Sequence, residues 1–453
     1  MNLNRLLAER AEQGRPVATA LIGAGKFGTM FLAQARHTAG MHVAGLADLS
    51  VDRARAALAA AGWSEERRGA ASVEAGLRDG SVHVTDDAAA LIADPAIEVV
   101  VECTGNPGAA LAHALACLEQ GKHLVNVTVE ADVLAGPLLA RRFAAAGLVY
   151  SLAYGDQPAL IAEQVDWART CGLSVVCAGK GTKYLPEYHR STPETVWGHY
   201  GLTPERAAAA GMNPQMFNSF LDGTKSAIEM AAVANACGLT PQPAGLRFPP
   251  CGVDDLPTVL RPAADGGSLD HGGTVEVVSS LERDGRPVFR DLRWGVYVVF
   301  EAPDDYVARC FADYGLKTDN SGRYAALYRP YHLIGLELGI SVASAALRGE
   351  PTGMPTGFRG DVAAVAKRDL AEGDELDGEG GATVYGRLMP AADSLAAGAL
   401  PIGLAHRVTL TRAVAEGEIV SCDAVRIDSA APTFRLRREM EAQFATPTDG
   451  AAP

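Results

Sequence analysis

VATALIGAGKFGTMFLAQA, residues 17–35, runs from an apolar stretch through a glycine turn into a second, helix-periodic stretch. This order predicts a buried strand, a tight turn and a helix. In the turn, Gly23 permits a sharp bend, Gly25 lets a pyrophosphate approach the backbone, and Gly28 allows the helix to pack on the strand. The free N–H groups and the dipole of the helix attract phosphates. The cofactor contacts predicted in this turn are Gly23, Ala24, Gly25, Lys26, Phe27 and Gly28.

A second apolar stretch, MHVAGLAD, ends at Asp48, about twenty residues after the glycine turn. An acidic residue at this place accepts hydrogen bonds from the ribose hydroxyls of NAD and repels the extra phosphate of NADP. Ser50, Arg53 and Arg55 follow, and their side chains work against that preference. The sequence therefore predicts an NAD(P)(H) cofactor, with NAD favoured by Asp48.

Strand-like and helix-like stretches go on alternating up to about residue 155, as in IEVVVECTG, KHLVNVT and LVYSLAYGD. This alternation predicts parallel crossovers, hence the α/β class with an amino-terminal doubly wound parallel sheet of the Rossmann type. Thr104 and Gly105 follow one of these strands. We expect them along the nicotinamide half of the cofactor groove, although an ordinary strand-ending turn explains them equally well.

The 453 residues carry a formal net charge of −14, and 48% of them are hydrophobic. This composition predicts a globular protein of two or three domains, and its acidic balance argues against nucleic acid as a partner. No apolar run is long enough for a membrane span, and the amphipathic start, MNLNRLLAERAEQ, lacks the apolar centre of a signal peptide. Eight cysteines without CxxC spacing predict reduced thiols in the cytoplasm. The ten histidines form no ligand-spaced pair, so we expect no dedicated zinc site.

Two lysines follow a later apolar stretch, VVCAGKGTKYLPEYH at residues 175–189. We expect the strand to end at Gly179, just before Lys180 and Lys183. A solvated turn is the ordinary explanation for such lysines. The alternative is a pair of cations at the carboxyl edge of a sheet, where the flanking glycines let backbone and ligand approach closely. Both lysines are therefore candidate catalytic residues.

The stretch NSFLDGTKSAIEMAAVANA, residues 218–236, predicts one long helix from about Pro214 to Ala236. Asn218, Asp222, Lys225 and Glu229 would share one face of that helix. Its other faces are mainly alanine, serine and large apolar residues, so the charged stripe is expected to line a cleft rather than face solvent. A buried ladder of structural ion pairs is the alternative.

Two further stretches carry candidate substrate-binding residues. AYGDQP, residues 153–158, places Tyr154 and Asp156 at the end of the last strand of the nucleotide domain, where substrates usually lie. YRPYHLIGLE, residues 328–337, contributes Arg329 and His332, although a lone histidine in an apolar segment is more often a core residue. The apolar residues 331–347 predict a helix that packs back on the earlier part of the chain.

RGEPTGMPTGFRGD, residues 348–361, has the composition of a linker. Beyond it, short strand-like stretches broken by turns predict a small β-rich module over residues 356–430. This module shows no cluster of catalytic groups, so we expect it to serve assembly or to shape the edge of a site. The last eight residues, TPTDGAAP, are expected to be frayed.

The chain resembles the oxidoreductases grouped with the deoxyxylulose phosphate reductoisomerase-like (DRL-type) enzymes, which are distantly similar to homoserine dehydrogenases. The resemblance is carried by GAGKFGTMF, KHLVNVTVEADV, AGKGTKY, DGTKSAIEMAAVANACGL and YRPYHLIGLE. It implies a homodimer of three-domain chains: an NAD(P)-binding domain at 1–155, a catalytic and dimerisation domain at 156–350, and a β-clip domain of the SAF type at 356–430. The residues that match the family's cleft are Lys180, Asp222, Lys225 and Glu229.

The resemblance implies an NAD(P)-dependent oxidoreductase that acts on a small polyol, sugar acid or sugar phosphate, with hydride transfer joined to an isomerisation. Lysines would stabilise an oxyanion and move protons. The carboxylates of Asp222 and Glu229 would hold the lysines, and are candidate ligands if the rearrangement needs a divalent cation. The alternatives are a plain dehydrogenase of the homoserine dehydrogenase type and a non-catalytic NAD-binding sensor.

Overall fold

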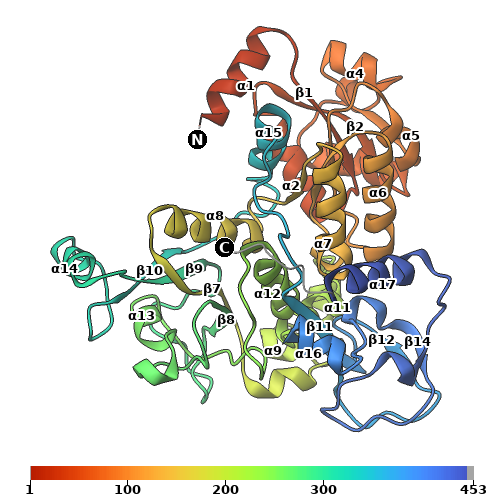
Figure 1. Ribbon diagram of the computed structural model, residues 1–453. Coiled ribbons are helices and arrows are strands. Elements are labelled where there is room, and N and C mark those ends of the chain that lie inside the picture. The colour runs from red at the N-terminus through yellow and green to blue at the C-terminus, as the bar shows by residue number, and fades with distance from the viewer. Residues whose placement is uncertain (1, 446–453) are drawn as a thin grey trace. The chain divides into compact units, whose positions relative to one another are not determined.

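The computed structural model describes residues 2–445 (Figure 1), and the fraying predicted for residues 446–453 lies outside the described residues. The described chain forms two compact units. Unit 1 contains the residues up to Leu160 together with His332–Thr356, and unit 2 contains Ile161–Tyr331 and the residues from Gly357 onward. The division into three domains at 1–155, 156–350 and 356–430 stays a prediction.

Unit 1 is built on a six-stranded parallel sheet with the strand order β3-β2-β1-β4-β5-β6. Every residue of β1 is buried, as expected for a central strand that is covered on both faces. This strand order is that of a doubly wound dinucleotide-binding sheet. The predicted α/β class and amino-terminal parallel sheet are therefore confirmed. The strands are β1 (Val17–Ile22), β2 (Met41–Ala47), β3 (His83–Thr85), β4 (Val99–Glu102), β5 (His123–Asn126) and β6 (Tyr150–Leu152).

Helices connect these strands, and α15 returns to the same unit from late in the chain, where it contacts β1, β4, β5 and β6. The sequence predicts that residues 331–347 form a helix that packs on the earlier part of the chain. The segment does pack there, but its helix begins only at Gly339. Gly335 has φ +75°, and a Cβ added there would lie 2.9 Å from the carbonyl oxygen of Phe27, so this part of the segment crosses α2 as irregular chain. The helices are α1 (Leu3–Glu12), α2 (Lys26–Ala35), α3 (Val51–Ala60), α4 (Val73–Asp79), α5 (Ala88–Ala93), α6 (Pro107–Glu119), α7 (Val129–Ala145) and α15 (Gly339–Arg348).

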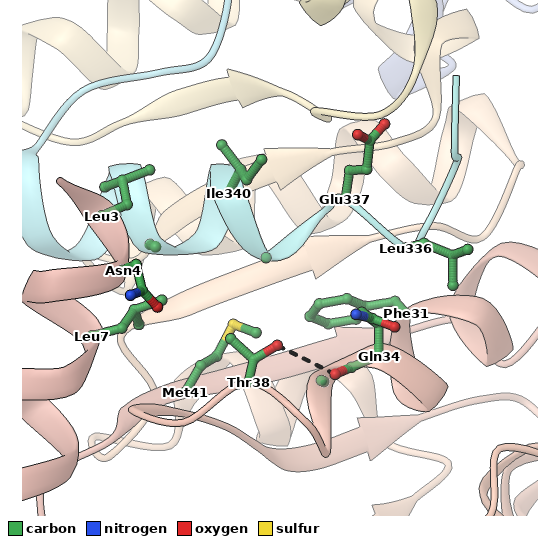
Figure 2. Close-up of a pocket in the computed structure, with 13 residues that line it drawn as sticks. Leu3, Asn4, Leu7, Phe31, Gln34, Thr38, Met41, Leu336, Glu337 and Ile340 are labelled. Atoms are coloured by element: carbon green, nitrogen blue, oxygen red, sulfur yellow. Dashed lines mark hydrogen bonds between the residues drawn. The ribbon is translucent and has the colours of Figure 1, made fainter. Parts of the chain in front are cut away.

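An apolar hollow of about 300 Å³ lies between α1, α2 and α15, as Figure 2 shows. Its lining includes Leu7, Phe31, Met41 and Ile340. Met41 is the first residue of β2, so the hollow lies at the amino ends of the parallel strands. The glycine turn follows the carboxyl end of β1, at the opposite edge of the sheet. The hollow is therefore not part of the predicted cofactor groove.

Asp132 in α7 is fully buried and accepts a hydrogen bond from the Tyr150 hydroxyl at 3.0 Å. Burial raises the pKa of the Asp132 carboxyl to about 7, and the hydrogen bond from Tyr150 opposes that shift only in part. In the unfolded chain the carboxyl ionises near pH 4. Between these two values the native state binds more protons than the unfolded state, so stability should fall as pH rises.

We expect the variant Asp132→Asn to lose this component of the pH dependence, because an amide does not titrate. The free energy of unfolding in urea, measured at about pH 5 and about pH 8, reports the difference. Wild type should lose more stability than the variant between the two conditions. Equal losses in both proteins would show that Asp132 does not titrate in this window.

Unit 2 contains a four-stranded mixed sheet with the order β10-β9-β7-β8. β7 pairs parallel with β8 and antiparallel with β9, so it is an inner strand of this sheet. The strands are β7 (Ser174–Thr182), β8 (Thr274–Ser279), β9 (Val296–Glu301) and β10 (Tyr324–Arg329). Helix α8 (Gln157–Thr170) begins in unit 1 and continues into unit 2. The other helices before the carboxyl-terminal segment are α9 (Val196–Tyr200), α10 (Pro204–Ala209), α11 (Pro214–Leu221), α12 (Thr224–Cys237), α13 (Leu256–Val259) and α14 (Asp305–Asp313).

The single helix predicted from Pro214 to Ala236 is wrong, because the chain breaks between α11 and α12 at Asp222 and Gly223. Gly223 has φ +89°, a conformation that ends a helix and that glycine adopts without steric cost. α12 contacts β7 and β8 of the mixed sheet and also β11 and β13 of the carboxyl-terminal segment (Figure 1). It is therefore buried on nearly all sides, which explains its alanine-rich composition.

The carboxyl-terminal segment forms two small antiparallel sheets within unit 2, β11-β13 and β12-β14-β15. This confirms the predicted change to short strands, while the SAF resemblance stays a prediction. Arg437 in α17 is buried and donates to Asp361 of β11 at 2.6 Å, which ties the last helix to the first of these sheets. The elements are β11 (Gly360–Ala366), β12 (Glu375–Asp377), β13 (Val384–Pro390), β14 (His406–Leu410), β15 (Val425–Arg426), α16 (Ala391–Ala396) and α17 (Pro432–Ala445). Across the residues described, no helix is long and apolar enough to cross a membrane.

Candidate functional site

The glycine turn of unit 1 has the shape that a dinucleotide site needs. Gly23 has φ +105°, and a Cβ added there would lie 2.7 Å from the carbonyl oxygen of Cys103. A Cβ on Gly28 would lie 2.4 Å from the carbonyl oxygen of Gly23. Both glycines are therefore required by packing. A Cβ on Gly25, the N-cap residue of α2, would meet nothing within 4 Å, so this backbone is open to a ligand.

Asp48 lies directly after β2 and fastens the glycine turn. Its carboxylate accepts hydrogen bonds from the backbone N–H of Ala24 at 2.8 Å and of Ser50 at 2.9 Å, and from Arg53 Nε at 2.9 Å. Burial alone would raise the pKa of Asp48, but these hydrogen bonds, led by those of Ser50 and Arg53, hold it below its usual value. Asp48 is therefore an ionised carboxylate whose charge is partly balanced by Arg53.

A buried carboxylate organises the loop after β4. Glu102 is fully buried and accepts hydrogen bonds from the Thr104 N–H at 3.1 Å and from the hydroxyls of Thr104 and Thr128. The Gly105 N–H in turn donates to the Thr128 hydroxyl oxygen at 3.1 Å. Because Cys103 Sγ also lies 3.1 Å from the Gly23 carbonyl oxygen, this loop and the glycine turn meet at one edge of the sheet. Thr104 and Gly105 thus lie at the carboxyl edge of the sheet beside the glycine turn, and their contact with a nicotinamide stays a prediction. Glu102 and Thr128 are not among the site residues predicted from the sequence.

The remaining candidates near unit 1 have structural contacts. The Tyr154 N–H donates to Ser341 Oγ at 2.8 Å, and Asp156 accepts from the N–H of Gln157 at the start of α8. His332 begins the segment that returns to unit 1. A Cβ on Gly155 would lie 3.0 Å from Glu337 Cβ, so this segment packs against the loop after β6. Arg329, the last residue of β10 in unit 2, lies with its guanidinium 5.7 Å from the centre of the Tyr331 ring.

Lys180 and Glu229 form a buried ion pair in unit 2. Lys180 is 6% exposed and Glu229 is 3% exposed. Lys180 comes from β7, an inner strand that continues to Thr182, so the prediction that the strand ends at Gly179 is wrong. Glu229 lies in the second turn of α12, which packs on β7. The pair therefore bridges the sheet and the helix.

The glycines beside Lys180 serve the packing of neighbouring backbone. A Cβ on Gly179 would lie 1.8 Å from the carbonyl oxygen of Glu276 and 2.8 Å from Tyr297 Oη. A Cβ on Gly181 would lie 2.0 Å from the carbonyl oxygen of Leu292. Only glycine fits at either position. The predicted reason, close approach of a ligand, is thus not the one that requires these two glycines.

Asp222 pairs with a lysine that the sequence analysis did not consider. Lys367, the residue after β11, places its Nζ 2.7 Å from Asp222 Oδ2, 2.7 Å from the Ser191 carbonyl oxygen and 2.6 Å from the Gly381 carbonyl oxygen. Asp222 is completely buried and Lys367 is 5% exposed. The carboxyl-terminal segment therefore does contribute a charged group, the Lys367 ammonium, to the surroundings of Asp222. VAAVAK, residues 362–367, has the same pattern as the stretch before Lys180, an apolar strand followed by lysine, and this signal could have identified it.

A histidine from a short 3₁₀ segment, Pro186–Arg190, also contacts Asp222. His189 Nδ1 lies 2.7 Å from the Asp222 carbonyl oxygen and must donate to it, while Nε2 lies 2.9 Å from Tyr184 Oη. Its ring stacks on Tyr385 at 4.5 Å between ring centres. Burial lowers the pKa of His189 and raises that of Tyr184 to about 12. A neutral imidazole that accepts from a neutral phenol satisfies both contacts.

Asn218 and Lys225, which were also predicted to lie on the charged face of the long helix, differ in how far they are buried. Asn218 in α11 is fully buried, accepts from the Ser191 hydroxyl at 2.6 Å and donates to the Gly380 carbonyl oxygen at 2.9 Å. It holds the loop that also supplies an acceptor to Lys367. Lys225, in the first turn of α12, is partly exposed. In residues 2–445 no three His, Cys, Asp or Glu side chains gather as a metal site would require.

Comparison with known proteins assigns two segments. Residues 23–146 match the NAD-binding domain of homoserine dehydrogenase, and residues 155–338 match the catalytic domain of the oxidoreductase DRL. The first match contains the glycine turn and Asp48, and the second contains Lys180, Asp222 and Glu229. Comparison with curated proteins gives no match.

Solved structures are similar over part of the chain. The myo-inositol dehydrogenase of Lactobacillus casei, in complex with NAD(H) and myo-inositol, has 19% identity and a TM-score of 0.29, covering 40% of this chain and 50% of that one. Biliverdin reductase from Synechocystis, in complex with biliverdin and NADP+, has 19% identity and a TM-score of 0.26, covering 40% of this chain and 54% of that one. The chain thus spans about half the length of the solved structures it matches.

The two assigned segments agree with the resemblance seen in the sequence, in both their nature and their order. Residues 155–338 are therefore similar to the catalytic domain of DRL-type oxidoreductases, and residues 23–146, which precede them, are similar to an NAD-binding domain of the homoserine dehydrogenase type.

Proposed function

We propose that the protein transfers a hydride between NAD(P)(H) and a carbinol or carbonyl carbon of a small polyol, sugar acid or sugar phosphate. The glycine turn and the loop held by Glu102 support cofactor binding, since both lie at the carboxyl edge of the unit 1 sheet. The match of residues 155–338 to an oxidoreductase catalytic domain supports the reaction class. A homodimer, implied by the family resemblance, and a cytoplasmic location, predicted from eight cysteines without CxxC spacing, are parts of the same proposal.

The difference between two buried lysines is the observation that carries the catalytic assignment. An ammonium group has three N–H donors. Lys367 donates all three of its N–H groups to acceptors within the protein, so it has no donor left for a substrate. Within the part of the chain that the structure describes, Glu229 is the single hydrogen-bond acceptor of Lys180. Lys180 is therefore the better candidate to stabilise a substrate oxyanion or move its proton, with Glu229 holding it in place.

The other candidates take supporting roles in this proposal. Lys225 and Lys183 contribute positive charge near the substrate, and Asp222 keeps Lys367 and the loop at Ser191 in place. Tyr154, Asp156, Asn218, Arg329 and His332 remain proposed substrate-binding residues. An isomerising step joined to hydride transfer is compatible with the DRL match, and so is plain dehydrogenation. A non-catalytic sensor would not need a buried lysine with unused donors.

A screen of the full-length protein tests this function. Polyols, sugar acids and sugar phosphates would be offered with each cofactor, and the change in reduced nicotinamide followed by absorbance. We expect turnover with a compound of one of these classes, and NMR of the product would show whether the carbon skeleton changes. A protein that binds the cofactor but turns over no member of the panel would contradict the proposal.

We propose that NAD binds more tightly than NADP and that Arg53 limits this preference, because it partly balances the charge of Asp48. Arg53→Ala leaves the Ala24 and Ser50 hydrogen bonds to Asp48 in place, so the NADP-to-NAD ratio of Kd should rise by about tenfold. Fluorescence titration of both reduced cofactors measures the ratio. Arg55→Ala, which removes an exposed arginine two residues away, is the control. An unchanged ratio in Arg53→Ala would show that Arg53 does not limit the preference, and tighter binding of NADP than of NAD by wild type would show that Asp48 does not favour NAD.

A further inference from the structure

The turn that carries Arg293 lies against the end of β7. A Cβ on Gly181 would lie 2.0 Å from the Leu292 carbonyl oxygen and 2.9 Å from the Arg293 nitrogen. The Gly181 N–H also donates to the Gly295 carbonyl oxygen at 3.1 Å. Glycine at position 181 is what allows this close approach. The turn therefore holds Arg293 beside the strand end, two residues before Lys183.

Lys183 and Arg293 are two like charges without an acidic partner. The pKa of Lys183 is lowered first by burial and second by the charge of Arg293. Lys183 donates to the His199 carbonyl oxygen, and Arg293 lies 4.7 Å from the centre of the Trp294 ring. Neither cation pairs with a carboxylate anywhere in residues 2–445. The chain as a whole has a net charge of −14, yet its described residues place no carboxylate against these two cations.

Two phenol groups lie in the same surroundings. Lys183 Nζ is 5.4 Å from the centre of the Tyr200 ring. Burial raises the pKa of Tyr200 to about 12, and the charge of Arg293 opposes this shift for both Tyr200 and Tyr188. The Tyr200 ring therefore lies beside the Lys183 ammonium.

We propose that Lys183 and Arg293 form an anion-binding subsite that holds the phosphate or carboxylate group of the substrate. The inference rests on the proposed function, and it narrows the substrate from any small polyol to one that carries an anionic group. Lysine contributes a point charge, and arginine contributes a planar fork that matches phosphate and carboxylate oxygens. The bound anion would supply the negative charge that the chain itself does not place there.

Glycerol phosphate and glycerate distinguish the two sources of the anion, because they share a small polyol skeleton and differ in the charged group. Their binding to the full-length protein would be measured by calorimetry at low ionic strength, with glycerol as the neutral reference. We expect one or both anions to bind, and glycerol not to bind. Tighter binding of glycerol phosphate would identify a phosphate ester as the substrate class, and tighter binding of glycerate a sugar acid.

The double variant Lys183→Met and Arg293→Met should weaken this binding by about tenfold or more. Arg290→Met is the matched control, because Arg290 is an exposed arginine near the same turn that already pairs with Asp254 at 2.9 Å. The single variants Lys183→Gln and Arg293→Gln provide the same comparison if the double variant does not fold. Equal anion affinity in wild type and variants, or no anion binding by wild type, would overturn the subsite. Cofactor titration of the same samples reports on the proposed function separately.

Discussion

Lys180→Met is expected to lower turnover by roughly 10²–10⁴-fold, the range typical of losing a positioned proton-transfer group. Affinity for NAD(P)H should stay nearly unchanged, because the glycine turn and Asp48 belong to unit 1 while Lys180 belongs to unit 2. Steady-state kinetics with the substrate found in the screen, together with fluorescence titration of the cofactor, measure both quantities. Glu229→Gln should lower turnover less, since an amide oxygen can still accept the hydrogen bond from Lys180.

Another buried lysine provides the control for this experiment. Lys122 is 7% exposed and donates to the carbonyl oxygens of Asp94 at 2.8 Å and Ile97 at 2.9 Å. It lies at the amino end of β5, at the edge of the unit 1 sheet opposite to the glycine turn. Lys122→Met should cost stability without a specific loss of turnover. If Lys180→Met kept near-normal turnover, or if both variants lost the same activity, the assignment of Lys180 as the proton-transfer group would be wrong.

Lys367→Met is expected to destabilise the protein by about 3–5 kcal/mol, because it leaves the buried Asp222 carboxylate without its cation. The Ser191 and Gly381 carbonyl oxygens lose a donor in the same change. Urea unfolding followed by circular dichroism gives the free energy of unfolding. The double variant with Asp222→Asn should recover part of the loss, since the buried charge is then removed as well.

An exposed ion pair in the same unit sets the baseline for this measurement. Arg286 and Asp284 form an ion pair at 2.7 Å with both side chains largely exposed. Arg286→Met should leave the free energy of unfolding nearly unchanged, because solvent screens an exposed ion pair. A similarly negligible cost for Lys367→Met would mean that this lysine does not hold the carboxyl-terminal segment to Asp222 at the break between α11 and α12.

The parts of the fold that the sequence predicts well are those set by local pattern. The amino-terminal sheet follows from apolar stretches that alternate with helices. The helix predicted from Pro214 to Ala236 failed at one residue, Gly223. Periodicity continues across that position, and only the φ of +89° reveals the break. Glycine inside an apolar-periodic stretch is tolerated in many helices, so the sequence pattern alone could not decide.

The site was predicted in part, because its residues lie in recognisable stretches but their partners are set by long-range packing. Lys180 and Glu229 were both candidates, and their pairing across 49 positions emerged only with the fold. Lys367 was overlooked because it lies 145 positions from Asp222, in a segment that looks like an accessory module. The sequence pattern could place lysines after apolar strands, but it could not say which of them has unused donors.

The hydride itself gives the most direct test of the central claim, that this protein is a nicotinamide-dependent oxidoreductase of small hydroxylated compounds. NADH or NADPH carrying deuterium at C4 of the nicotinamide would be incubated with the protein and the carbonyl form of the substrate. The account predicts that deuterium appears on the carbinol carbon of the product, where NMR detects it, and that Lys180→Met slows its appearance. Cofactor binding without any transfer of deuterium to product would contradict the account.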